Sequence, residues 1–133
     1  MTKVTGIGGV FIKANDAKVL AAWYDKYPGI PFGEHLYVDY KWINENNPAV
    51  AGHTVFSFFK EESNYFAPSQ SYFMINFRVK DLNALLDDLR KEGIWVDEKV
   101  EEYEYGKFGW IMDPEGNKIE LWELVGKTES PKE

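Results

Sequence analysis

Two segments of the chain have the same order of hydrophobic and polar positions. Residues 9–30 and 74–94 each open with the alternation of a strand and continue with apolar residues at helical spacing. Asp16 and Asp81 separate the two patterns, at positions where an aspartate caps the free N–H groups of a helix start. They lie 65 residues apart (81 − 16 = 65), about half of the 133-residue chain. The sequence therefore predicts an internal repeat that begins with a strand and a helix.

The alternation also assigns side chains to the two faces of the predicted sheet. In the first strand of each repeat, the residues expected to face the helix are Val10, Ile12 and Ala14, and Ile75, Phe77 and Val79. The open face then carries Lys13 in the first repeat and Met74, Asn76 and Arg78 in the second. The apolar helix positions expected to pack on the sheet are Val19, Leu20 and Trp23, and Leu82, Leu85, Leu86 and Leu89.

Shorter strand patterns follow each helix, which makes the expected fold α+β with the order βαβββ twice. They cover residues 33–42 and 53–60 in the first half and 95–99, 103–112 and 117–125 in the second. We expect one module over residues 1–64, a second over 65–125 and a polar disordered tail over 126–133. Residues 44–52 are expected to form a polar loop and residues 62–71 the linker between the modules.

Composition and charge narrow the classes of function. A hydrophobic fraction of 44% fits one globular domain whose halves share a core. The net charge of −7 disfavours nucleic acid as a partner. Because cysteine is absent, disulfides, thiolate catalysis and Cys-based zinc sites are excluded. No apolar run is long enough for a signal peptide or a membrane span, so we expect a soluble, cytoplasmic protein with no membrane partner.

The closing segment FGWIMDPEGNKIELWE, residues 108–123, joins an aromatic strand to a second alternating strand through an Asp-Pro-Glu-Gly-Asn turn. With the repeated strand-Asp-helix openings, it resembles the vicinal oxygen chelate superfamily. This superfamily includes glyoxalase I, bleomycin-resistance proteins and extradiol dioxygenases. The resemblance implies that the modules form a curved mixed sheet around a cup, that the protein is a homodimer, and that four strands present metal-ligand positions in the cup.

The four superfamily metal positions fall on Gly9, on or near Ser57, on Met74 and on Glu120. Only Glu120 keeps a ligand type used by the superfamily, because glycine has no side-chain donor and a thioether is a poor ligand for these ions. A stable divalent site normally takes at least three protein ligands. We therefore expect no metal and no other cofactor, with a divalent metal held by other residues as the alternative.

Glu120 lies between Ile119 and Leu121 on a strand that otherwise has the composition of a core strand. It is either a ligand-contacting residue, a catalytic acid or base, or a structural carboxylate paired with Lys13 or Arg78. The candidate ligand-binding residues are Lys13, Ser57, Asn76, Arg78, Trp110, Glu120 and Trp122. An aromatic ladder of Tyr103, Tyr105, Phe108 and Trp110 is expected on one strand, and Tyr65 and Phe66 either close the cup or anchor the linker.

Three functions remain open. The leading one is a glyoxalase-like or bleomycin-resistance-like protein that binds a small, partly aromatic or anionic molecule in its cup without a metal. The second is a metal-dependent lyase or isomerase of the glyoxalase type, in which Glu120 is ligand or base. The third is a non-catalytic assembly or regulatory module whose cup is filled by side chains.

Overall fold

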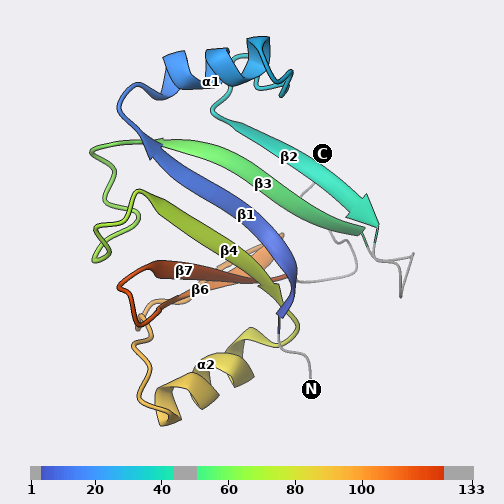
Figure 1. Cartoon of the computed structure of the whole chain (residues 1–133). Helices are drawn as coiled ribbons and strands as arrows, with labels where there is room; N and C mark the ends of the chain where they lie inside the picture. Colours follow the sequence, from blue (N-terminus) through green and yellow to red (C-terminus); the bar gives the residue numbers. More distant parts are fainter. Residues whose placement is uncertain (1–3, 44–50, 125–133) are drawn as a thin grey trace.

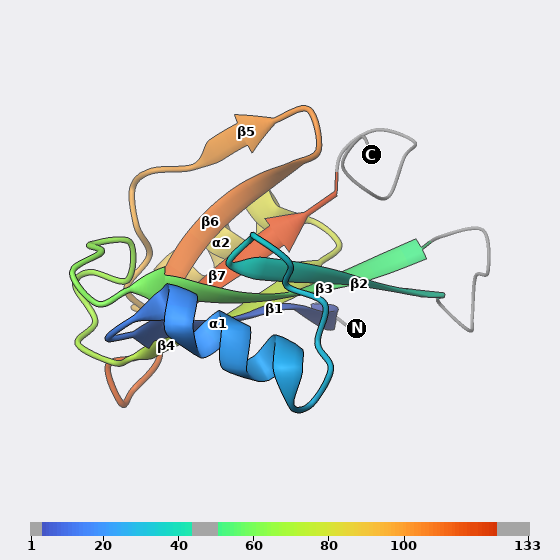
Figure 2. The same ribbon diagram turned by 90° about the horizontal axis from the view of Figure 1, so that it is seen from above.

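The computed structural model of the chain describes residues 4–43 and 51–124. In these residues seven strands form one mixed sheet in the order β2-β3-β1-β4-β7-β6-β5, curled into a half-barrel (Figures 1 and 2). The elements are β1 (Val4–Ala14), α1 (Ala17–Lys26), β2 (Tyr37–Ile43), β3 (Ala51–Lys60), β4 (Phe73–Val79), α2 (Leu82–Lys91), β5 (Glu101–Tyr103), β6 (Gly106–Met112) and β7 (Lys118–Glu123). The predicted α+β class is confirmed, and the predicted tail and most of the predicted polar loop lie outside the described residues.

The predicted repeat is present in the positions of the elements. Asp16 accepts a hydrogen bond from the backbone N–H of Val19 at 3.2 Å, and Asp81 accepts one from Ala84 at 3.1 Å, so each caps its helix. Strands β1 and β4 pair antiparallel in the centre of the sheet, and each also has a parallel partner from its own half, β3 and β7. Both helices have ten residues, about 15 Å, and no helix of the described chain could cross a membrane.

The first half differs from the predicted βαβββ order. Within the described residues it contains β1, α1, β2 and β3, whereas the second half contains all four strands of its module. The residues after α1 form turns until β2 begins at Tyr37, four residues later than the predicted start. Gly33 explains this difference, because it has a φ of 60° and its N–H donates to the Asp25 carboxylate at 2.9 Å, and the N–H of His35 then donates to the Phe32 carbonyl at 3.0 Å, so these groups form a turn instead of pairing with a strand.

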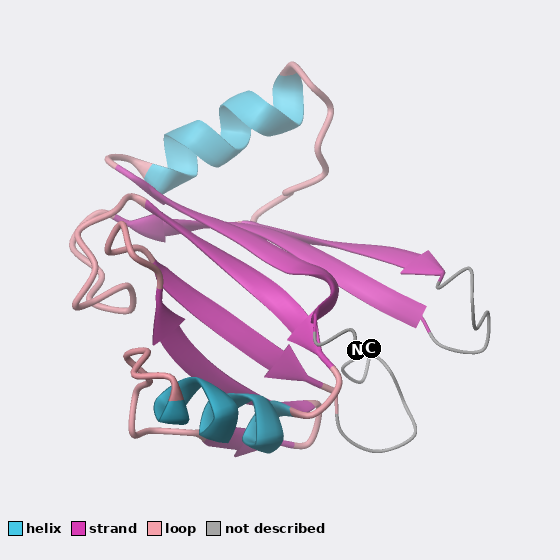
Figure 3. Cartoon of the chain, turned by 60° about the horizontal axis from the view of Figure 1, so that its bottom comes forward, coloured by secondary structure: helices cyan, strands magenta, loops and turns pink. Residues whose placement is uncertain are grey.

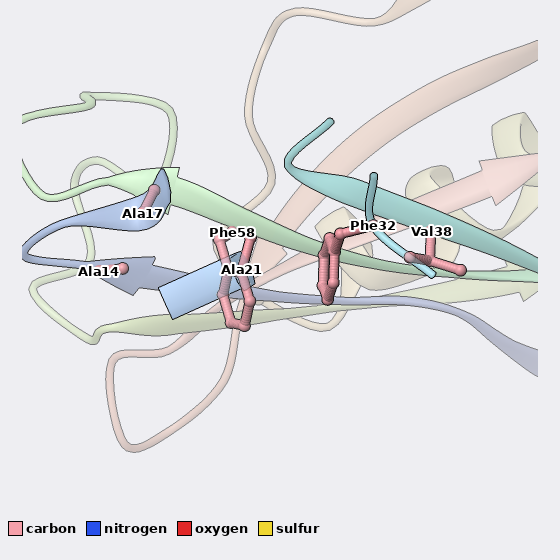
Figure 4. Close-up of a cluster of buried hydrophobic side chains, with 6 residues drawn as sticks. All are labelled: Ala14, Ala17, Ala21, Phe32, Val38 and Phe58. Atoms are coloured by element: carbon pink, nitrogen blue, oxygen red, sulfur yellow. The ribbon is translucent and has the colours of Figure 1, made fainter. Parts of the chain in front are cut away.

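Both helices lie on one face of the sheet, over different halves (Figures 1 and 3). The predicted packing of α2 is confirmed, because Leu82, Leu85, Leu86 and Leu89 pack with Phe77, Val79, Ile119 and Leu121. Under α1 the cluster consists of Ala14, Ala17, Ala21, Phe32, Val38 and Phe58, as Figure 4 shows.

The predicted buried face of α1 is wrong in two of its three residues. Val19 is 65% exposed and Trp23 is 51% exposed, while Leu20 alone is partly buried. Ala17 and Ala21 take their place against the sheet. The large ring of Phe58 on β3 already occupies much of the space between the sheet and α1, so close packing there needs small helix residues.

Two predicted strands of the second half also differ. Residues 95–99 make only a single bridge, between Val96 and Ile111, because the Asp97 carboxylate accepts the backbone N–H of Lys99 at 3.0 Å and turns the chain. The predicted strand 103–112 is a hairpin: Tyr103 pairs with Gly106 across the turn. The aromatic residues 103–110 are therefore spread over two strands and a turn.

The turn at residues 113–117 forms as its composition predicts. The Asp113 carboxylate accepts hydrogen bonds from the backbone N–H groups of Glu115 (2.9 Å) and Asn117 (2.8 Å). Gly116 has a φ of 83°, a conformation that favours glycine. This turn fixes the register of β6 and β7, and β7 carries Glu120.

Candidate functional site

The inner face of the sheet, opposite the helices, is filled at its centre by aromatic and sulfur side chains. Phe11, Phe66, Met74 and Trp110 form a buried cluster there. Phe66 comes from the segment between β3 and β4 and is fully buried, so it acts as the anchor of this segment. Its neighbour Tyr65 stacks on Phe59 at 5.5 Å and meets Trp110 edge to face at 6.2 Å.

Glu120 lies at this centre, with 2% of its surface exposed. Asn76 on β4 and Trp110 on β6 stand directly opposite Glu120 in the two neighbouring strands. The Asn76 amide donates to Glu120 Oε1 at 2.5 Å, and the Trp110 indole N–H donates to Oε2 at 3.0 Å. The Tyr65 hydroxyl also donates to Oε2. The structure thus brings together three of the predicted site residues.

Glu120 is held by neutral donors rather than by a cation. No ion pair joins it to Lys13 or Arg78 in the described chain, so its partners differ from the predicted structural pair. Burial raises the pKa of the Glu120 carboxyl, and the hydrogen bonds from Tyr65, Asn76 and Trp110 oppose this rise. Burial and the Glu120 charge also raise the pKa of the Tyr65 phenol. Tyr65 therefore stays protonated and donates to the carboxylate.

A pocket of about 270 Å³ opens beside this network. Tyr65 and Trp110, whose side chains both donate to Glu120, form part of its wall. The remaining wall is polar and carries both signs of charge. The lining residues are Asn64, Tyr65, Asp97, Lys99, Glu101, Trp110 and Lys118.

Lys118 is the buried cation of this pocket, with 7% of its surface exposed. Its ammonium donates to the Tyr65 backbone carbonyl at 2.9 Å and lies 5.6 Å and 5.5 Å from the ring centres of Tyr65 and Trp110. Burial lowers the pKa of Lys118, and the charge of Asp97 opposes this shift. Sequence reasoning missed Lys118, although its alternation with Glu120 and Trp122 was a signal for the inner face.

Arg78 and Trp122 belong to a second cluster. The Arg78 guanidinium lies between the rings of Trp122, at 5.4 Å, and Trp42, at 5.8 Å. Phe108 stacks on Trp122 at 5.5 Å and contacts the mutually stacked rings of Tyr103 and Tyr105. Three of the four residues of the predicted ladder therefore pack here, and Trp110 belongs to the Glu120 network instead.

Lys13 and Ser57 lie apart from the pocket. The Lys13 ammonium is 5.3 Å from the ring centre of Phe66. Ser57 on β3 stands opposite Phe11 on β1 and Tyr37 on β2. Neither residue lines the pocket beside Glu120.

The superfamily's metal positions do not fit an ion in this chain. Gly9 has no donor, Met74 is fully buried in the aromatic cluster, and both Glu120 oxygens already accept hydrogen bonds. Across residues 4–43 and 51–124, no group of three or more His, Cys, Asp or Glu side chains is placed to hold a metal ion. To complete a divalent metal site, these residues would need additional donor atoms from a bound ligand or from other residues.

The fold is shared with several solved structures. Methylmalonyl-CoA epimerase from Mycobacterium tuberculosis is 20% identical over 95% of this chain and 92% of its own, with a TM-score of 0.61. A variant of the Streptomyces coelicolor methylmalonyl-CoA epimerase, in complex with 2-nitronate-propionyl-CoA, is 15% identical over 92% and 99%, with a TM-score of 0.65. A glyoxalase/bleomycin resistance protein/dioxygenase superfamily member from Vibrio splendidus 12B01 is 12% identical over 88% and 97%, with a TM-score of 0.57.

The chain has the fold of the vicinal oxygen chelate superfamily. The resemblance carried by the closing segment is thus confirmed at the level of the fold. No protein-family model and no curated protein matches the sequence. Sequence identities of this size show a shared fold and do not show a shared activity, so the function has to be argued from the residues of the site.

Proposed function

We propose that this protein binds a small, partly aromatic or anionic molecule in the pocket beside Glu120, without the superfamily's metal. The observation that carries this proposal is the position of Tyr65 and Trp110. Both donate to the buried Glu120 carboxylate, and both line the pocket. Glu120 is therefore a positioning residue, because it fixes the two side chains that contact the ligand.

The chemistry of the wall supports such a ligand. Fixed aromatic rings provide a flat apolar surface at little cost in side-chain entropy, because their rotamers are already set by hydrogen bonds. The Lys118 ammonium uses one hydrogen bond on the Tyr65 carbonyl and has further N–H groups for an anionic group. The pocket is slightly smaller than the range typical of drug-sized ligands, so the molecule is small.

Two alternative functions, a metal-dependent enzyme and an assembly module, are supported by different observations. A metal-dependent lyase or isomerase is the function nearest to the epimerases that share this fold, but Gly9 and Met74 supply no suitable donor. A non-catalytic assembly module is favoured by the side chains that fill the centre of the inner face. The pocket beside them favours ligand binding over that module.

A two-dimensional ¹⁵N NMR titration with phenol, benzoate and phosphate tests the proposal. We expect benzoate to perturb the Trp110 indole N–H and the backbone amides of residues 97–101, with saturation. A Trp110→Phe variant keeps a ring but loses the donor to Glu120, so it should bind more weakly. Perturbations that are absent at saturating concentration, or confined to residues outside the pocket, would contradict ligand binding at this site.

We also propose that the protein is a homodimer. The central strands expose apolar side chains, with Ile7 on β1 47% exposed and Phe73 on β4 44% exposed. Ile7 pairs with Phe77 and Phe73 pairs with Ile12, residues that pack in the helix-side clusters, so both lie on the outer face. A second copy of the chain is the partner that would cover them.

A further inference from the structure

We infer that the ligand of this pocket is a zwitterion, an α-amino acid with an aromatic side chain. The inference rests on the proposed function and names the chemical class that the same pocket accepts. It follows from which charges face the pocket and from which of them are already paired.

Two of the four charged side chains at the pocket satisfy each other. The Lys99 ammonium lies 3.2 Å from a Glu101 carboxylate oxygen and forms an ion pair with it. Glu101 also accepts the hydroxyl of Tyr103 at 2.6 Å, and this hydrogen bond lowers its pKa. Lys99 and Glu101 therefore offer little unbalanced charge to a ligand.

The other two charged side chains at the pocket, Lys118 and Asp97, are not paired with each other. No ion pair joins them in the part of the chain that the structure describes, although each lines the pocket. One Asp97 oxygen accepts the Lys99 backbone N–H, and the carboxylate keeps acceptor capacity beyond this bond. The wall of the pocket thus contains a cation and an anion that form no ion pair with each other.

This arrangement favours a zwitterion over a singly charged ligand. A carboxylate placed against Lys118 comes close to the negative charge of Asp97, and an ammonium placed against Asp97 comes close to the positive charge of Lys118. A zwitterion places each of its charges against the opposite one, and each contact is a charge-assisted hydrogen bond. The rings of Tyr65 and Trp110 then receive the aromatic side chain.

The volume of the pocket fits an aromatic α-amino acid. About 270 Å³ holds a molecule of the size of one aromatic amino acid and is small for larger ligands. The α-carboxylate and α-ammonium of an amino acid are held close together on one carbon, which suits two opposite charges on the wall of a single small pocket.

Three probes that share a phenylethyl unit test the inference: L-phenylalanine carries both charges, 3-phenylpropanoate only the negative one and 2-phenylethylamine only the positive one. Each is titrated into the protein while the Trp110 indole N–H is followed by NMR. We expect L-phenylalanine to bind at least about tenfold more tightly than either of the others, the difference that one charge-assisted hydrogen bond makes.

Two variants assign the charges. Asp97→Asn should remove the preference for L-phenylalanine over 3-phenylpropanoate, and Lys118→Met should remove the preference over 2-phenylethylamine. Lys91→Met on α2, an exposed lysine away from the pocket, is the matched control and should leave both ratios unchanged. Circular dichroism establishes that each variant is folded.

The outcomes separate the inference from the proposed function. If 3-phenylpropanoate perturbs Trp110 and binds as tightly as L-phenylalanine, the zwitterion inference is wrong and ligand binding at the pocket stands. If none of the three probes perturbs Trp110 or residues 97–101, the zwitterion inference is wrong, and the proposed function is wrong as well if phenol, benzoate and phosphate also fail to perturb them. A preference for L-phenylalanine that survives in both charge variants would also overturn the assignment of the charges.

Discussion

Burial and hydrogen bonding act on the Glu120 carboxyl in opposite directions, and burial is the larger effect, so its pKa is raised above the ordinary 4.5. For an acid with a raised pKa, the stabilisation from the folded environment is complete below the ordinary pKa and is lost as the pH rises through the folded pKa. The ionised form of Glu120 therefore costs stability at neutral pH.

We predict that Glu120→Gln makes stability less dependent on pH. A glutamine keeps the size and one acceptor. Its amide N–H₂ can donate to Asn76 Oδ1 once the Asn76 amide turns over, because Oδ1 is buried and has no hydrogen-bond partner in the described structure. Urea unfolding should show that the free energy of unfolding of the variant, minus that of the wild type, increases from about pH 4 to pH 8. A difference that is constant with pH would contradict the raised pKa.

Glu120→Ala should behave differently. Removal of the carboxylate leaves the donors of Tyr65, Asn76 and Trp110 without their acceptor and opens a cavity at the centre of the inner face. We expect the free energy of unfolding to fall by about 2–5 kcal/mol at neutral pH. Equal stability of the alanine and glutamine variants would show that the hydrogen bonds to Glu120 contribute little.

Sequence reasoning could place Asn76, Trp110 and Glu120 on one face, because alternation along a strand depends only on the local chain. It could not place Tyr65 or Asp97, which lie outside the strands and reach the pocket through the path of loops. The ion-pair interpretation of Glu120 also came from alternation alone. Lys13 and Arg78 do share the inner face, but aromatic rings hold their charges there.

At the scale of the element, the β6–β7 turn depends on the ionised side chain of Asp113. The hydrogen bond from the Asn117 side chain is the largest of the effects that lower the pKa of Asp113 below its ordinary 3.8. For an acid with a lowered pKa, the stabilisation is present above the ordinary value and is lost as the pH falls through the folded pKa.

We predict that Asp113→Ala lowers the urea midpoint at pH 7 and lowers it less at about pH 2, where the wild-type carboxylate is also protonated. The carboxylate then no longer accepts the N–H groups of Glu115 and Asn117 as an anion. Glu115→Ala, at an exposed position of the same turn, is the control and should leave the midpoint nearly unchanged at both pH values. An equal loss at both pH values would rule out a role for the charge.

The two helices allow a matched pair of substitutions, because the buried face predicted from the sequence is correct for α2 and wrong for α1. Leu86 on α2 is 1% exposed and packs against Gly109 of β6, so Leu86→Ala should lower the free energy of unfolding by about 2–5 kcal/mol. Val19→Ala on α1 removes an exposed side chain and should change it by less than about 0.5 kcal/mol. Urea unfolding measures both, and similar losses would contradict the observed packing of α1.

Helical period identified both helices and their Asp caps, but it could not decide which side of α1 is buried. Alanines at 17 and 21 and larger apolar residues at 19 and 23 lie on different sides of the same helix. A prediction from the sequence buries the larger apolar residues. In the structure the rings of Phe32 and Phe58 leave space only for the two alanines. In α2 leucines form a single apolar face, so period and packing agree.

At the scale of the whole molecule, the repeat relates β1 to β4, and these two strands form the middle of the sheet between the helices (Figure 1). Apolar side chains exposed on one central face favour a two-fold contact, because in such a contact each residue appears on both partners. A stable interface of this kind buries about 800 Å² on each partner. The exposed Ile7 and Phe73 are the residues that this contact would cover first.

We predict that the wild-type protein has twice its 15.4 kDa chain mass in solution and that Phe73→Asp converts it to a monomer. One substitution places two carboxylates in a two-fold interface, which costs much more than one exposed charge on a monomer. Tyr37→Asp on the edge strand β2, at a position slightly more exposed than Phe73 but on the inner face, should leave the protein a dimer. Multi-angle light scattering gives the masses, and a wild-type mass of one chain would show that these apolar residues are exposed for another reason.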